Sequence, residues 1–144
     1  MKILKITAIL LIFAGIIACG DKEDYNSLLD TKWKLVGIVD AETGDQTELE
    51  PKDCDDCYTL AFDADDYLSG KSSTNFLACT YRINYKAGKF YFANIGGTEM
   101  GEFGDGYKYV EILWEIKSFI IKDTYLYLYY NDNKNYLKYK EIGD

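Results

Sequence analysis

Two cysteines separated by two residues form the pattern in this 144-residue chain that most suggests chemistry. Cys54 and Cys57 make a C-x-x-C motif, which is typical of a disulfide, of half a zinc site or of a redox-active dithiol. The chain has no second C-x-x-C and no histidine, so a closed zinc site would need Cys79 and a carboxylate as well. Asp55 and Asp56 lie between the two cysteines and disfavour a reactive thiolate. We therefore interpret Cys54 and Cys57 as a structural disulfide.

The absence of histidine limits the catalytic mechanisms open to the chain. Without an imidazole there is no Ser/His/Asp triad, no Cys/His dyad and no histidine-ligated metal. The acidic runs at 53–56 and 63–66 lack the spacing and the distal glutamate of an EF-hand loop, so we interpret them as solvated turns. We predict a protein that is not an enzyme and that has no catalytic residue, metal or cofactor.

Tyrosine is in excess, with 14 copies. In the segment 125–130, leucines alternate with tyrosines, so the leucines share one face of a strand and the tyrosines the other. A row of exposed aromatic rings can stack on sugar rings; cross-strand packing is the alternative role. The candidate ligand-binding residues are Tyr125, Tyr127, Tyr129 and Tyr136.

The first 18 residues have the composition of a secretory signal peptide. Lys2 and Lys5 precede an apolar run over residues 6–18, which is short for a membrane-spanning helix and ends in small residues. The run closes in Ile-Ile-Ala followed by Cys19, which resembles the lipobox of bacterial lipoproteins. The resemblance implies that residues 1–18 are a lipoprotein signal peptide and that the Cys19 thiol carries a diacylglycerol. Acyl chains on Cys19 would anchor the protein in a membrane.

Removal of the leader would leave 14 basic against 24 acidic residues, a net charge of −10. Such a domain is repelled by anionic lipid surfaces and has little affinity for nucleic acid. Directly after Cys19, residues 20–24 place a lysine before two acids, which resembles the signal that exports lipoproteins to the cell surface in one group of Gram-negative bacteria. A solvated tether over residues 19–29 is the alternative interpretation. We expect an outer-membrane lipoprotein, and the first interpretation adds exposure at the cell surface.

The rest of the chain, residues 30–144, reads as one domain rich in strands. Apolar residues alternate with polar ones in several segments, and a turn at 86–88 joins two of them in a hairpin. Alternation also places Cys79 on the inward face, where we favour a free buried thiol over pairing with Cys54 or Cys57. The predicted strands lie at 31–39, 58–62, 77–85, 89–93, 119–122, 125–130 and 136–140.

The hydrophobic period changes after a glycine-rich loop at 95–106. Four apolar residues then recur at helical spacing and predict a helix over 107–117, with Asp105 able to cap its start. We predict a mainly β (α+β) fold: a small, antiparallel, barrel-like sheet with one late helix. The four apolar residues are Tyr109, Ile112, Leu113 and Ile116.

A family resemblance joins two of these segments. Residues 75–85, from Asn75 through Cys79, resemble the hairpin motif of META/HslJ-like domains, and residues 95–100 resemble the Thr-x-Met loop of that family. The late helix and the final two strands also fit. The family often has a second cysteine just after the Met loop, where this chain has Gly101 and Glu102, so a disulfide between hairpin and loop is in doubt. The resemblance implies a small envelope β-barrel without general catalytic chemistry.

These observations lead us to expect a non-catalytic cell-envelope lipoprotein whose barrel is a binding or structural module. Two alternatives stay open: a surface carbohydrate-binding module that uses the tyrosines, and a protein inhibitor or partner-docking domain. The partners would be the membrane, through the lipid on Cys19, and a glycan or an envelope protein. A barrel interior filled by side chains would place function on the outer surface, whereas an aromatic cavity would favour a carrier.

Overall fold

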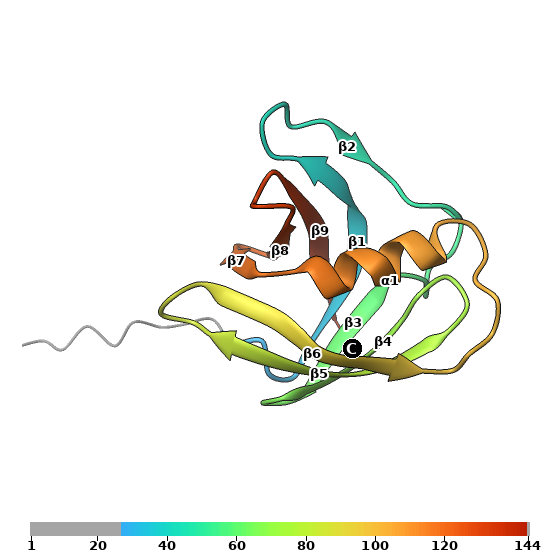
Figure 1. The fold of residues 1–144 in the computed structure, drawn as a ribbon, viewed down its shortest axis with the longest axis horizontal. Coiled ribbons are helices and arrows are strands. Elements are labelled where there is room, and N and C mark those ends of the chain that lie inside the picture. Colours follow the sequence, from blue (N-terminus) through green and yellow to red (C-terminus); the bar gives the residue numbers. More distant parts are fainter. Residues whose placement is uncertain (1–26, 144) are drawn as a thin grey trace, which may run out of the picture.

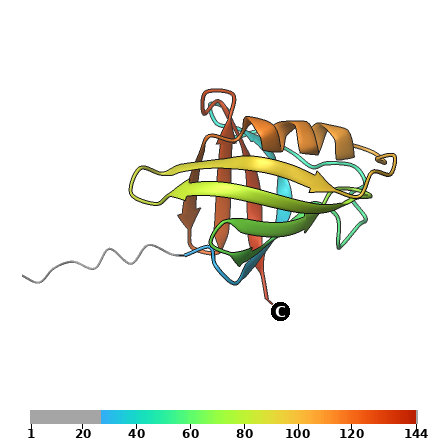
Figure 2. The same ribbon diagram turned by 60° about the horizontal axis from the view of Figure 1, so that its bottom comes forward.

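An antiparallel sheet that curves back on itself forms the body of the domain. The computed structural model describes residues 27–143. The strands are β1 (Thr31–Asp40), β2 (Gln46–Thr47), β3 (Thr59–Ala64), β4 (Tyr67–Lys71), β5 (Phe76–Asn84), β6 (Lys89–Gly97), β7 (Ser118–Lys122), β8 (Tyr125–Tyr130) and β9 (Asn135–Ile142), and the helix is α1 (Gly106–Glu115). Their order in the sheet is β2-β1-β3-β4-β5-β6-β7-β8-β9, and β1 also pairs with β9. Figures 1 and 2 show the strands curving around one interior, with α1 lying against them. The predicted fold class is confirmed.

The sequence pattern misses two strands and misplaces three boundaries. β2 has two exposed residues, and β4 has one fully buried residue, Leu68, so neither shows a clear alternation. The predicted loop at 95–106 begins later than expected, because Ile95 continues β6 beyond a bulge. Tyr58 has a positive φ and precedes β3 instead of starting it. Leu28, which we placed in the tether, is fully buried, so the folded domain extends at least to this residue.

Aromatic side chains fill the interior of the barrel. The ring of Tyr81 stacks on that of Phe90, with centroids 5.3 Å apart, and meets the edge of Phe62 at 5.2 Å. Trp33 is 2% exposed, and its indole N–H donates to Thr31 Oγ1 at 2.7 Å. Side chains of this volume leave the interior packed like other protein cores. The filled interior therefore directs the search for a binding site to the outer surface.

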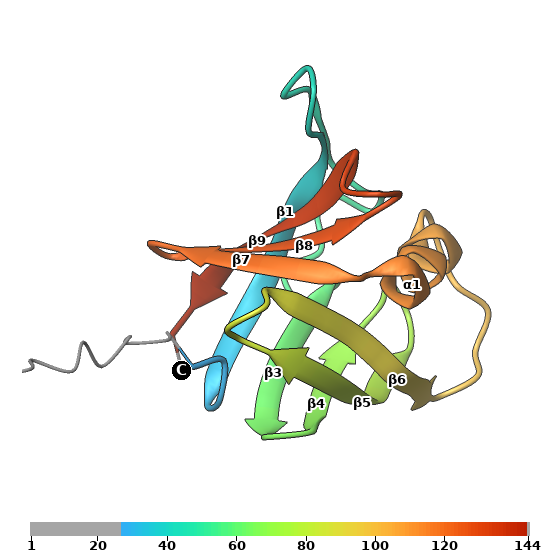
Figure 3. The same ribbon diagram turned by 60° about the vertical axis from the view of Figure 1, so that its left-hand side comes forward.

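Helix α1 covers the place where the barrel does not close. β6 and β7 pair only at Lys89 and Ser118, and Figure 3 shows the two strands diverging from that point with α1 in the gap. The predicted apolar stripe of the helix faces the core, with Tyr109 and Leu113 fully buried. Asp105 occupies the N-cap position, but the predicted side-chain cap is wrong. Its carboxylate accepts the Glu50 N–H at 2.8 Å instead of a helix amide.

A buried pair of tyrosines joins α1 to the sheet. The hydroxyls of Tyr109 and Tyr139 lie 2.8 Å apart, and both side chains are fully buried. Burial raises the pKa of both tyrosines, so both hydroxyls stay protonated and one donates to the other. The hydrogen bond satisfies two polar groups that would otherwise be stranded in the core.

We expect Tyr139→Phe to destabilise the domain by about 1–3 kcal/mol, because it leaves the Tyr109 hydroxyl buried without its partner. The double variant Tyr109→Phe/Tyr139→Phe removes both hydroxyls and should recover most of that loss. Urea unfolding followed by near-UV circular dichroism measures the three free energies. A double variant whose loss equals the sum of the two single losses would contradict this account of the pair.

Candidate functional site

A groove crosses the outer face of β3, β4 and β5. Its floor is a row of small side chains placed opposite one another by the strand register: Ala61 faces Ser69, and Ser69 faces Ala78. Tyr67 stands on one side of this row and is 39% exposed, while Phe76 stands on the other and is 66% exposed. We call this site the outer groove. It has a volume of about 740 Å³, and Ile142 at the end of β9 also borders it.

Charged and hydroxyl groups surround the apolar floor of the outer groove. Lys71 forms an ion pair with Asp56, and its Nζ lies 5.9 Å from the centre of the Phe76 ring. The hydrogen bond from Lys71 lowers the pKa of Asp56. The hydroxyl-bearing residues Thr59, Ser69 and Thr98 also line the groove. The Ser69 hydroxyl donates to Asp63 Oδ2 at 2.7 Å. An aromatic ring beside hydroxyls and an ion pair is suited to holding a ligand.

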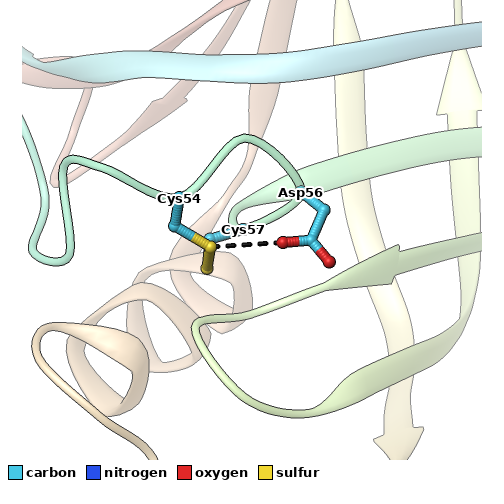
Figure 4. A group of neighbouring side chains, drawn as sticks. All are labelled: Cys54, Asp56 and Cys57. Atoms are coloured by element: carbon cyan, nitrogen blue, oxygen red, sulfur yellow. Dashed lines mark hydrogen bonds between the residues drawn. A yellow bond between two sulfur atoms is a disulfide. The ribbon is translucent and has the colours of Figure 1, made fainter.

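A disulfide fastens the loop next to the outer groove. Cys54 and Cys57 are joined with their Cα atoms 5.4 Å apart, and the Lys34 ammonium donates to the carbonyl oxygens of both residues, at 2.7 Å for Cys54. Figure 4 shows Asp56 beside them, with Oδ1 3.2 Å from Cys54 Sγ. A disulfide sulfur carries no proton, so this is a close contact. The disulfide thereby clamps the turn that leads into β3.

The same three residues bring together donor atoms that suit a metal. One ligand atom from each of Cys54, Asp56 and Cys57 lies within 4.8 Å of the others. The disulfide engages both sulfurs and leaves one carboxylate as an anionic ligand, and Lys34 places a positive charge on the same loop. Cys79 is not part of this group: it is free and buried, as predicted. Burial raises the pKa of the Cys79 thiol to about 12, so it is protonated and unreactive at neutral pH.

The tyrosine row lies on the outer face of β8 and β9 and is tightly packed. Tyr136 is directly opposite Tyr129, with ring centroids 5.1 Å apart, and its ring meets that of Tyr127 at 5.4 Å. The Lys138 ammonium lies 4.7 Å from the centre of the Tyr125 ring. All four rings are half-buried. Each ring of the row is therefore less exposed than Phe76, which is 66% exposed in the outer groove.

Sequence reasoning missed a polar cluster that ties the start of β5 to the loop before α1. The Glu102 carboxylate accepts hydrogen bonds from Ser72 Oγ at 2.6 Å, Ser73 Oγ at 2.7 Å, Asn75 Nδ2 at 2.8 Å and the Thr74 N–H at 3.1 Å. We call this set the Glu102 cluster. Partial burial raises the pKa of Glu102, but the four hydrogen bonds outweigh that effect and hold it below its usual value. The run Ser-Ser-Thr-Asn was the available signal, because four hydrogen-bonding residues in succession are typical of a built turn.

Asn75 extends this cluster to the Thr-x-Met loop. Its side-chain oxygen accepts from the Met100 N–H at 2.8 Å and from Thr98 Oγ1 at 2.9 Å, and its amide donates to the Met100 carbonyl at 2.8 Å. Gly97 begins this loop with a φ of 148°, and a Cβ there would lie 1.9 Å from the Phe76 carbonyl oxygen. Residues 77–79 of β5 already pair with residues 95–97 of β6, and Asn75 adds side-chain hydrogen bonds between the ends of the two segments.

Comparison with known proteins supplies a relative over nearly the whole chain. A protein of Tannerella forsythia described as "Putative lipoprotein" is 32% identical over 141 residues, which cover 96% of this chain and 94% of the relative. This chain belongs to the same lipoprotein family. No family model matches it. None of the helices between residues 27 and 143 has the length and apolar character needed to cross a membrane.

Two solved structures share the fold. The NMR structure of a protein from Burkholderia xenovorans matches with a TM-score of 0.64 at 23% identity, over 81% of this chain and 85% of that one. The crystal structure of a duf4847 family protein from Bacteroides vulgatus matches with a TM-score of 0.58 at 15% identity, over 77% of this chain and 92% of that one. At these identities the two structures support the barrel architecture of the lipoprotein and nothing about its ligand.

We expect Glu102→Gln to lower the free energy of unfolding by about 1–3 kcal/mol at pH 7. The glutamine NH2 group cannot accept a hydrogen bond, so two of the four bonds are lost, and the remaining two become weaker neutral ones. The folded-state pKa of Glu102 is depressed, so its stabilisation is present above the unfolded pKa and lost as the pH falls through the folded value. The difference between wild type and variant should therefore shrink as the pH is lowered below about 4. Urea titrations at several pH values measure it. Glu99→Gln, an exposed change in the same loop, is the control; equal pH dependence of both variants would contradict the role of Glu102.

For the disulfide, we expect Cys54→Ser/Cys57→Ser to cost about 2 kcal/mol of stability, the modest value expected for so short a closed loop. Thiol alkylation followed by intact mass measurement should label only Cys79 in the unfolded, unreduced protein, apart from any free thiol at Cys19. Labelling of Cys54 or Cys57 without a reductant would refute the pairing.

Proposed function

We propose that this lipoprotein is a non-catalytic protein of the outer membrane that binds a ligand on the outside of its barrel. Residues 1–18 act as the signal peptide, Cys19 carries the lipid, and a short polar tether presents the barrel at the cell surface. The relative in Tannerella forsythia and the order of basic residues, apolar run and cysteine support the anchoring. The net charge of −10 after cleavage supports a lipid anchor in place of electrostatic adhesion to the membrane.

We also assign the barrel to a META/HslJ-like type. This part of the proposal rests on the two motif segments and on the way Asn75 connects them through Met100 and Thr98. Glu102 stands close to the point where the family often has a second cysteine, and its hydrogen bonds join the same two parts of the chain. A carboxylate would thus replace a covalent link in this branch.

The observation that carries the binding role is the contrast between the filled interior and the outer groove. Phe76, Tyr67 and Ile142 are 66%, 39% and 39% exposed around one groove, and exposed apolar side chains that gather at one place mark a binding surface more often than single ones do. Sugar rings have flat C–H faces that stack on aromatic rings and hydroxyls that bond to serine, threonine and charged side chains. Phe76 and Tyr67 on either side of a flat floor, with Ser69 and Lys71 beside them, offer both kinds of contact. A glycan is therefore the ligand class that we assign to the groove.

The tyrosine row is the second candidate platform for the same ligand class. Tyr127, Tyr129 and Tyr136 form a continuous aromatic surface, with neighbouring ring centroids 5.1 to 5.4 Å apart. Such a surface could stack on several sugars of one chain. The outer groove ranks first because Phe76 is 66% exposed, contacts no other aromatic ring of residues 27–143 and lies beside a recess.

To test the anchor, we expect cells grown with labelled palmitate to incorporate the label into the wild-type protein. Cys19→Ser should abolish incorporation and leave an uncleaved, heavier precursor, because the thiol that accepts the diacylglycerol is gone. Cys79→Ser is the matched control and should keep the label. An unlabelled wild-type protein that begins at Met1 would refute the anchor.

To test the ligand, the full-length protein in detergent is screened on a glycan array and the binding constants are measured by calorimetry. We expect Phe76→Ala to weaken glycan binding about tenfold, which corresponds to one lost ring contact of about 1.4 kcal/mol. Tyr127→Ala is the matched control and should change it little. The reverse order would move the site to the tyrosine row, and the absence of binding at millimolar sugar would exclude the glycan proposal.

A further inference from the structure

The second half of β6 has no strand partner on one side among residues 27–143. β6 meets β7 only at its start, where Phe90 N–H donates to the Lys117 carbonyl and Lys89 pairs with Ser118. Beyond that point, no other strand of residues 27–143 pairs with this side of β6. An unpaired strand edge is a template for another extended chain unless charge, proline or a covering element protects it. The sequence Phe-Ala-Asn-Ile-Gly-Gly at residues 92–97 contains neither a charge nor a proline, and α1 is the element that lies beside this edge.

The alternation of the backbone identifies the groups on this edge. In an antiparallel strand the N–H and C=O of one residue point to the same side, and the next residue points to the other. Because the backbone N–H of Phe90 points towards β7, the backbone N–H and C=O of Phe92 point to that side as well. After the bulge, the Thr98 N–H donates to the carbonyl oxygen of Phe76 on β5. The backbone N–H and C=O groups of Ile95 and Gly97 therefore point away from β5. Three residues of β6 thus present backbone donors and acceptors on the open side.

Helix α1 forms the opposite wall of a groove along this edge. The groove has a volume of about 410 Å³, and residues 95–97 of β6 line one side of it while Tyr107 and Val110 of α1 line the other. Trp114 continues the same helix face one turn further on and is 46% exposed. Tyr107 is 62% exposed and Met100, at the wide end, is 58% exposed. Figures 2 and 3 show α1 running alongside β6 across this opening. We call the site the edge groove.

Charge distinguishes the two ends of the edge groove. Glu99 and Glu102 lie at the wide end, and Glu111 is exposed on α1 beside Tyr107. Lys89 and Lys117 lie at the narrow end, where β6 and β7 meet. With a net charge of −10 on the mature chain, the wide end favours a positively charged partner.

We propose that the edge groove binds an extended, basic segment of a partner protein, which adds to the sheet as a strand next to β6. A strand edge facing a helix is a known arrangement for peptide capture: backbone hydrogen bonds supply affinity, and pockets for alternate side chains supply specificity. Apolar side chains of the segment would contact Val110 and Trp114, and a lysine or arginine would face Glu99. This site lies apart from the outer groove and does not depend on the glycan proposal.

The test uses the ¹⁵N-labelled full-length protein in detergent and a blocked octapeptide of alternating valine and lysine. We expect hydrogen exchange of the Phe92, Ile95 and Gly97 amides to slow at least tenfold when the peptide binds. The emission of Trp114 should shift to shorter wavelength, and Trp114→Phe should lose that shift while the buried Trp33 remains as an internal reference. Protection of other amides instead, or no binding at millimolar peptide, would overturn the proposal.

Three comparisons separate strand addition from simple charge attraction. The same peptide methylated on alternate amide nitrogens keeps its charge but loses one hydrogen-bonding edge, and it should bind at least tenfold more weakly. A valine–glutamate octapeptide should also bind at least tenfold more weakly. Val110→Lys should reduce binding by a similar factor, while Ala78→Lys, the matched change in the outer groove, should not. Equal binding of the methylated and unmethylated peptides would refute strand addition. Self-association that protects the same amides in the absence of peptide would assign the edge to a second copy of this chain and overturn the proposal.

Discussion

The pairing of β1 with β9 is the constraint on which the rest of the barrel depends. The two strands are antiparallel over residues 32–40 and 135–142, and this contact turns a sheet into a closed wall. A bulge between Leu35 and Gly37 reverses which side chains of β1 face the interior. Before the bulge, Trp33 and Leu35 are buried in the core. After it, Val39 lies opposite Tyr136 and is 3% exposed, although it does not belong to the main core cluster.

This reversal explains why the tyrosine row is half-buried. Val39 points to the outer face after the bulge and must be covered there, and Tyr136 is its cross-strand neighbour. Tyr129 and Tyr127 pack against Tyr136 and extend the cover. The row thus stabilises the closing strands, and that structural role competes with any use as a platform for sugars. Phe76 does not cover a buried side chain in this way, and this is the physical reason that the outer groove ranks above the tyrosine row.

Closure at β1 and β9 contrasts with the opening between β6 and β7. The chain leaves β6 at Gly97, and the Glu102 cluster then holds the following loop against residues 72–75. The chain therefore turns away from β6 before α1 begins, and β7 returns to meet only the first residues of that strand. Apolar packing of Tyr109 and Leu113 seals the interior at this place without pairing the edge. Buried side chains thus close the interior of the barrel to solvent, while the second half of β6 has no strand partner on one side.

The properties that could be predicted from the sequence are those with a local period. Alternation marks the strands that contain Tyr81, Phe90 and Leu128, and helical spacing marks α1, because each of these elements buries one face. The outer groove has no local signal: Ala61, Ser69 and Ala78 are ordinary small residues on three strands, and only the register brings them together. The C-x-x-C motif, in contrast, has a local signal with several chemical meanings.

The Glu102 cluster links residues 72–75 to the loop that precedes α1. In the sequence, no periodic pattern marks Glu102 as the residue that makes this link. In the structure, Glu102 makes that link with four hydrogen bonds to residues 72–75. A carboxylate cross-link of this kind withstands reducing conditions and weakens in acid, which is the opposite of a disulfide. The fold therefore combines a redox-sensitive link at Cys54 and Cys57 with an acid-sensitive link at Glu102. The Glu102 link holds in place the end of β6 and the start of α1, which together form the edge groove.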